Sequence, residues 1–174
     1  LDDLTIATGT VTFPTDSISI GGSFANTGGT FAHNNAEVIF NGSGANTIEQ
    51  QGTAFLNAFY DVRFNNAAGN WSYIDTNATT SNLYTIQDGN VTFPSGQLTV
   101  GGDFTVTSGS FDPNGGEVVF ENATSETITV NGQSFNDVRI VGAGGSGWYG
   151  SGWSSRLAVT INASEVDSTL SEFP

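Results

Sequence analysis

The sequence contains no cysteine, lysine or methionine, and it has only three arginines and one histidine among 174 residues. Without cysteine the chain can form no disulfide framework, no thiolate metal site and no thiol nucleophile. Without lysine it has neither a Schiff-base residue nor a lysine general base. No apolar stretch approaches the ~20 residues of a membrane-spanning helix. These absences exclude several enzyme classes and argue against membrane insertion.

Positive charge is nearly absent: the chain has 17 acidic residues, a formal net charge of −14 and a sequence pI near 4.1. Such a chain repels nucleic acid. The charge comes from missing lysine and not from an excess of carboxylate, since the acidic residues are under a tenth of the chain. The composition therefore favours a polar extracellular surface. The chain begins Leu1-Asp2-Asp3 without the regions of a signal peptide, so we expect it to be processed or excised from something longer.

An internal repeat dominates the sequence. Residues 11–14 (VTFP) recur at 91–94, and 37–40 (EVIF) recur as EVVF at 117–120. Over 4–55 against 84–135, 21 of 52 positions are identical at an offset of 80. Farther on the offset falls to 76, where Asp61-Val62-Arg63 matches Asp137-Val138-Arg139. We divide the chain into a lead (1–3), repeat 1 (4–82), repeat 2 (83–150) and a tail (151–174).

Within each repeat, hydrophobic residues alternate with polar ones, as at Leu98, Val100, Phe104 and Val106. This period of two predicts strands with one buried face, and the intervening Gly, Asn, Asp and Ser predict turns. No stretch has a convincing helical period.

The repeat and its strand spacing predict an all-β fold, a parallel β-helix or β-solenoid built from two repeats of about 80 residues. Four coils of about 20 residues per repeat would make a rod ~40 Å long. Residues 80 apart should then occupy equivalent coils, with inward phenylalanine ladders. The predicted ladder residues are Phe13, Phe24, Phe31, Phe40, Phe55 and Phe64, matched by Phe93, Phe104, Phe111, Phe120, Phe135 and Ile140. The alternative is two small antiparallel β-sandwiches.

The segment 98–140 (LTVGGDFTVTSGSFDPNGGEVVFENATSETITVNGQSFNDVRI) and its counterpart 18–64 resemble β-solenoid repeats of bacterial and archaeal adhesin-like surface proteins. In that family a Gly-x-Phe turn leads to a Val-x-Phe strand, then a Thr-Ile strand and a Gly-x-x-Phe corner. The resemblance covers about 4–148. It implies a stalk or adhesive module without an active site of its own.

The tail, from Gly152-Trp153 through Leu157–Ile161 to Pro174, resembles the opening of a DUF2341 domain. That β-rich domain is often joined to lectin-like modules in surface proteins. Alternatively, Leu157–Ile161 could be a strand donated to a neighbouring subunit.

Two segments are candidate ligand sites. Asp112, Asn114 and Glu117 supply oxygen ligands around glycines, which is the ligand type that calcium prefers, although a plain turn explains the same residues. Trp148, Tyr149 and Trp153 lie in a glycine-rich stretch and could stack on sugars, or could form a junction at the end of the repeat.

The sequence predicts no catalytic residues. A catalytic triad would need His33, the one histidine, and repeat 2 has Pro113 there. Arg63 and Arg139 each follow an aspartate by two residues, so we expect exposed ion pairs or contacts along a ladder.

These observations favour a non-enzymatic, extracellular structural or adhesive module of a cell-surface protein or fibre, polymerising end to end or by strand donation. Its partners would be neighbouring domains, copies of itself or surface glycans. No cofactor is expected, with calcium as the one candidate. The alternatives are a carbohydrate-binding module and, less favoured, a polysaccharide-cleaving β-helix enzyme, whose carboxylate pair would have to face a cleft.

Overall fold

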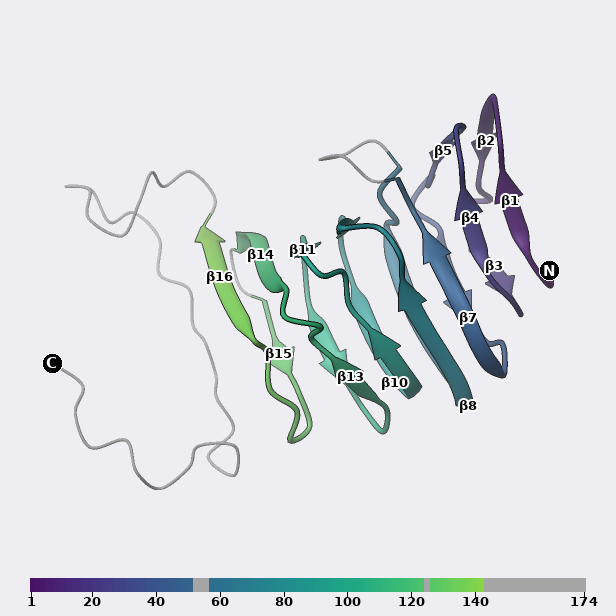
Figure 1. The fold of residues 1–174 in the computed structure, drawn as a ribbon. Coiled ribbons are helices and arrows are strands. Elements are labelled where there is room, and N and C mark those ends of the chain that lie inside the picture. The colour runs from purple at the N-terminus through teal and green to yellow at the C-terminus, as the bar shows by residue number, and fades with distance from the viewer. Residues whose placement is uncertain (52–56, 124–125, 143–174) are drawn as a thin grey trace, which may run out of the picture.

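The computed structural model describes residues 1–51, 57–123 and 126–142. It contains sixteen strands within these residues and no helix, and every strand pair is parallel. Figure 1 shows the strands stacked along one axis, from β1 near the N-terminus to β16. The chain is therefore a β-solenoid of about six turns, and the antiparallel-sandwich alternative is wrong.

Each turn of the solenoid contributes three strand positions, which stack into three faces. Face one contains β1 (Leu4–Ile6), β4 (Phe24–Asn26), β7 (Gly44–Glu49), the second half of β8 (Asp61–Tyr73), the second half of β10 (Tyr84–Thr92) and β13 (Ser110–Asp112). Face two contains β2 (Thr10–Thr12), β5 (Thr30–Ala32), β9 (Asn77–Thr80), β11 (Gln97–Val100), β14 (Glu117–Ala123) and β16 (Asp137–Gly142). Face three contains β3 (Ser17–Ile20), β6 (Glu37–Phe40), the first halves of β8 and β10, β12 (Phe104–Val106) and β15 (Ile128–Thr129).

Two long strands, β8 and β10, pass from face three to face one without interruption. Their register shifts twice at this corner, between Ile86 and Asp88 and between Asp88 and Asn90. These irregularities allow the strand to bend. As a result, faces one and three join into a single ten-stranded sheet.

The rungs are spaced 19 to 25 residues apart, as in the pairings Ala123↔Gly142, Leu4↔Phe24 and Ile48↔Tyr73. The predicted coil of about 20 residues is thus close to the observed one. Six steps of ~4.8 Å give a rod about 29 Å long. Eight coils and 40 Å were expected, and that estimate is too large for the described part of the chain.

The two repeats do not occupy equivalent faces, so the expectation that residues 80 apart share a position in the coil is wrong. β1 lies on face one, whereas its counterpart, the first half of β10, lies on face three. Likewise β3 lies on face three and its counterpart β11 on face two. The reason is that repeat 1 spans eleven positions: ten are filled by β1 to β7, the two halves of β8 and β9, and one, on face two between β7 and β8, has no strand among the described residues. Eleven is not a multiple of three, so repeat 2 is rotated by a third of a turn about the axis.

Aromatic rings fill the core. Because strands are parallel and in register, paired side chains lie one rung apart and stack, as Phe40 does on Phe64 (5.2 Å) and Tyr84 on Phe104 (5.4 Å). The predicted inward phenylalanines that the structure describes in repeat 1 are all buried. Phe55 lies outside the described residues.

The partner of Phe135 differs from the prediction. Phe135 packs against Phe104, Phe111 and Phe120. The repeat-1 counterparts of these three rings are Phe24, Phe31 and Phe40, and they pack against Phe59. The offset has therefore already fallen to 76 at Phe59, so the extra residues of repeat 1 precede this ring.

Tight turns separate the short strands at matching places in both repeats. Asn34 and Asn35 have φ values of 50° and 59°, and Asn114 and Gly115 have 50° and 74°. The Ala36 and Gly116 amides donate to the carbonyls of residues 33 and 113. Positive φ at both central residues is typical of a type I′ turn, which Asn and Gly tolerate best.

Candidate functional site

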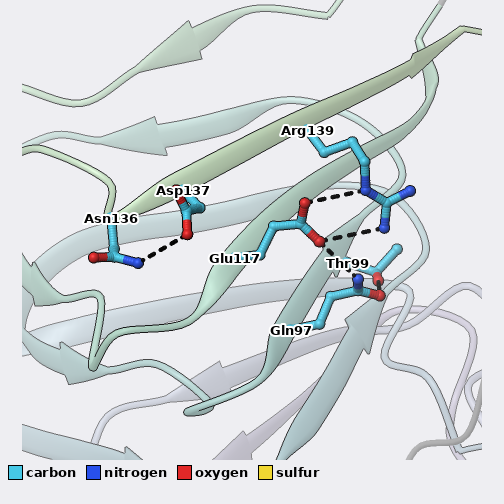
Figure 2. A network of polar contacts seen from close by, with 6 residues as sticks. All are labelled: Gln97, Thr99, Glu117, Asn136, Asp137 and Arg139. Atoms are coloured by element: carbon cyan, nitrogen blue, oxygen red, sulfur yellow. Dashed lines mark hydrogen bonds and ion pairs between the residues drawn. The ribbon is translucent and has the colours of Figure 1, made fainter.

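Two residues that the sequence singled out, Glu117 and Arg139, belong to a polar network on the outer side of face two. The Arg139 guanidinium on β16 donates to both Glu117 oxygens on β14, at 3.1 Å and 3.3 Å (Figure 2). Gln97 on β11 donates to the same carboxylate at 3.1 Å, and Thr99 donates to Gln97 at 3.2 Å. The network therefore joins three successive turns.

Repeat 1 contains the same ion pair on face three. Arg63 donates to Glu37 at 2.8 Å, and its other terminal nitrogen donates to Gln87 in the following turn at 3.3 Å. Both arginines that the structure describes thus bond a glutamate one turn earlier. The expected ladder contacts are confirmed.

An ion pair within one strand, between Asp61 and Arg63 or between Asp137 and Arg139, is not formed in the structure. The Asp61 carboxylate instead accepts hydrogen bonds from the Asn82 side chain at 2.7 Å and the Leu83 amide at 2.9 Å. Asp137 accepts a bond from Asn136. Residues two apart on a strand point the same way but are ~6.6 Å apart, whereas the neighbouring rung is ~4.8 Å away.

Hydrogen bonding by Arg139 lowers the pKa of Glu117, partial desolvation opposes this, and the bond from Gln97 lowers it further. Glu117 is therefore ionised at neutral pH, and its two oxygens are occupied by donors. An ionised carboxylate held in this way can fasten strands together, but it is poorly suited to donate a proton as a general acid.

The candidate calcium ligands do not converge. Asp112 ends β13 on face one and accepts a hydrogen bond from the Asn114 amide at 2.8 Å. The Asn114 side chain donates to the Phe93 carbonyl at 3.1 Å, and Glu117 bonds Arg139 on face two. No group of three or more His, Cys, Asp or Glu residues in the described part of the chain could hold a metal ion. The plain-turn interpretation accounts for these contacts.

The candidate sugar-binding residues Trp148, Tyr149 and Trp153, and the tail that resembles DUF2341, lie outside the described residues. His33 is half-buried. Its Nδ1 accepts the Asn35 amide at 3.0 Å, and its ring stacks on Tyr60 with centroids 5.2 Å apart. His33 therefore supports the turn that the sequence predicted around it.

Sequence reasoning missed a buried amide cluster where repeat 1 departs from repeat 2. The Gln50 side chain forms two hydrogen bonds with the Thr79 backbone, at 2.7 Å and 2.9 Å, and the Asn26 side chain donates to the backbone carbonyl of Gln50. Asn57 accepts the Phe31 amide at 2.9 Å. These side chains supply backbone partners on face two between β5 and β9, where the described residues contain no strand. The signal was available, because Asn26 and Gln50 occupy positions where repeat 2 has valine.

Two buried tyrosines mark the junction between the repeats. Burial raises the pKa of both Tyr73 and Tyr84 well above the usual value for a phenol. Both hydroxyls are therefore neutral throughout the physiological pH range. Their rings complete the core at the turn where repeat 1 ends and repeat 2 begins.

Comparison with protein families, with curated proteins and with solved structures found no match. No helix long and apolar enough to cross a membrane occurs among the residues that the structure describes.

Proposed function

We propose that this chain is a non-enzymatic structural or adhesive module of an exported cell-surface protein or fibre. One observation carries the proposal: the outward polar side chains of both repeats make matching contacts between successive turns. They fasten one rung of the solenoid to the next. Polar residues used in this way stiffen a rod, whereas those of an enzyme converge on a site.

Three kinds of contact between successive turns occur in both repeats. Asn34 and Asn114 both donate to a phenylalanine carbonyl one turn earlier, at 3.1 Å in each case. The side chains of Ser23 and Asp103 accept the amides of Thr47 and Thr127 in the next turn. The Glu37–Arg63 and Glu117–Arg139 ion pairs are the third kind.

The extracellular assignment rests on sequence features. Exported proteins that bear no disulfides need another source of rigidity, and the parallel hydrogen-bonded rungs with their aromatic core supply it. The resemblance to adhesin-like surface repeats points to the same location.

Single-molecule force measurements on the chain, held by its two ends, test the structural part of the proposal. We expect cooperative unfolding with length gains of either the whole solenoid or single turns, about 70–80 Å for each 20–24 residues. Gradual extension without discrete events would contradict a mechanical role.

A panel of polysaccharides and a glycan array test the remaining alternatives. We expect no release of sugar ends from any polysaccharide, and cleavage of one would overturn the non-enzymatic assignment. A glycan hit that is lost in Trp148→Ala would instead identify an adhesive module that binds sugar.

A further inference from the structure

The first and last turns of the described solenoid expose core residues that a neighbouring turn covers elsewhere. Leu4, Val11 and Ile18 in the first turn are half-buried. Their repeat-2 counterparts, which have a turn before them, are fully buried: Tyr84, Val91 and Leu98 are 0–1% exposed. The two repeats are therefore an internal comparison of a covered and an uncovered turn.

The opposite end shows the same difference. Val138 on β16 is 47% exposed, whereas its counterpart Val62 on β8 is 1% exposed. β16 pairs with β14 on one edge, and β1 pairs with β4 on one edge. Among the described residues no strand pairs with the other edge of either. An open parallel edge with exposed apolar residues favours the addition of another strand.

The chain itself contains the template for this addition. The first half of β8 pairs with the first half of β10 in the register Val62↔Tyr84, Arg63↔Thr85 and Phe64↔Ile86. β16 repeats the β8 segment and β1 repeats the β10 segment. The same register between two molecules would pair Val138 with Leu4, Arg139 with Thr5 and Ile140 with Ile6.

We propose that β16 of one copy adds in parallel to β1 of a second copy in this register, so that the chain assembles head to tail. The inference rests on the structural function proposed above and specifies its partner. β16 lies on face two and β1 on face one, so each added copy is rotated by a third of a turn, as repeat 2 is on repeat 1. A head-to-tail contact of this kind does not close on itself and produces a filament.

One substitution between the repeats weakens this contact. Within the chain, Asn82 donates to Asp61 across the equivalent junction at 2.7 Å. The counterparts of these residues are Asp2 and Asp137, so the assembly brings two carboxylates together. Like charges at close range oppose association. Asp2→Asn should therefore restore the hydrogen bond and promote filament growth.

Disulfide trapping tests the register, because the natural chain has no cysteine. In an Asp2→Asn background, a Thr5→Cys chain is mixed with an Arg139→Cys chain under mild oxidation. Both positions are exposed and outward-facing, and directly paired Cα atoms ~4.8 Å apart lie within disulfide range. The matched control replaces Arg139→Cys by Asp137→Cys, two residues along the same strand and ~8 Å from residue 5 in this register.

We expect at least ten-fold more cross-linked heterodimer from the 5–139 pair than from the 5–137 pair. Equal yields, or no heterodimer, would overturn the register. Sedimentation velocity provides a second measurement: Asp2→Asn should shift the chain to larger species, and Asp88→Asn, which removes one charge in mid-rod, should not. A larger shift from Asp88→Asn would also overturn the proposal. Failure here leaves the force and glycan tests intact, because those use single chains.

Discussion

Phe104 is the best place to test whether the aromatic core holds the solenoid together. Its side chain is fully buried on β12, and five rings surround it: Tyr84 at 5.4 Å, Phe135 at 5.2 Å, Phe111 at 5.8 Å, and Phe93 and Phe120 at 6.1 Å between centroids. These residues come from three successive turns. Removing the ring should therefore weaken the stacking on both sides of β12.

The magnitude follows from the buried area. About 150 Å² of ring surface at ~25 cal/mol per Å² gives about 4 kcal/mol, within the range of roughly 3–5 kcal/mol typical of Phe→Ala in cores. Phe104→Leu keeps most of the volume and should cost about 1–2 kcal/mol. Thr105→Ala, on the same strand but facing outward and half-buried, should cost under about 0.5 kcal/mol.

Equilibrium denaturation measures these differences, followed by far-UV circular dichroism and by tryptophan fluorescence. Agreement between the two probes would show that the turns unfold together. If Phe104→Ala lowered the free energy of unfolding by less than about 1 kcal/mol, or by no more than Thr105→Ala, the packed aromatic core would be refuted.

Three further predictions concern pH, close packing and the length of a turn. The pKa of Glu117 is lowered in the folded state, so its ion pair stabilises the fold above the ordinary glutamate pKa of 4.5 and loses this effect as pH falls through the folded value. The difference in the free energy of unfolding between the wild type and Glu117→Gln should therefore shrink as the pH is lowered. A difference that is unchanged between pH 7 and pH 3 would contradict this. Gly101→Ala should lower the free energy of unfolding by ~1–3 kcal/mol, because a Cβ there would lie 2.2 Å from a backbone oxygen of the neighbouring turn. Gly21→Ala is the equivalent change in repeat 1. Its Cβ would meet its nearest atom at 3.2 Å, so it should lower the free energy of unfolding by less. Deleting residues 97–116 removes one whole turn and should leave a cooperatively folded solenoid by circular dichroism, whereas deleting 97–109 moves every later strand to the wrong face; equal stability of the two variants would disprove three strand positions per turn.

Alternation along the chain predicted much of the fold. Residues predicted to face inward in the ladder, such as Phe24 and Phe40, are buried, and the turn at Asn34 falls where polar residues interrupt the alternation. Both features are local, because a strand of period two has only two sides. The resemblance to surface repeats and the site predictions at Trp148 and its neighbours remain predictions.

The candidate site was predicted only in part. The sequence indicated that Arg63 and Arg139 belong to ladders, but it could not show that their partners are Glu37 and Glu117, 26 and 22 residues away. Those contacts depend on which residues lie on the neighbouring rung. The same limit applies to Gln50, whose side chain forms two hydrogen bonds with the Thr79 backbone, 29 residues away.

The sequence by itself determined the class of the fold, the two repeats and the inward residues, because hydrophobic alternation and turn residues act within a few positions of each other. Only the tertiary structure decided the face on which each strand lies. β8 and β10 continue round a corner where other segments turn tightly, and repeat 1 spans eleven positions in turns of three. The rotation of repeat 2 by a third of a turn follows from these eleven positions. Their number depends on how neighbouring turns pack, because packing decides which segments pair on each face.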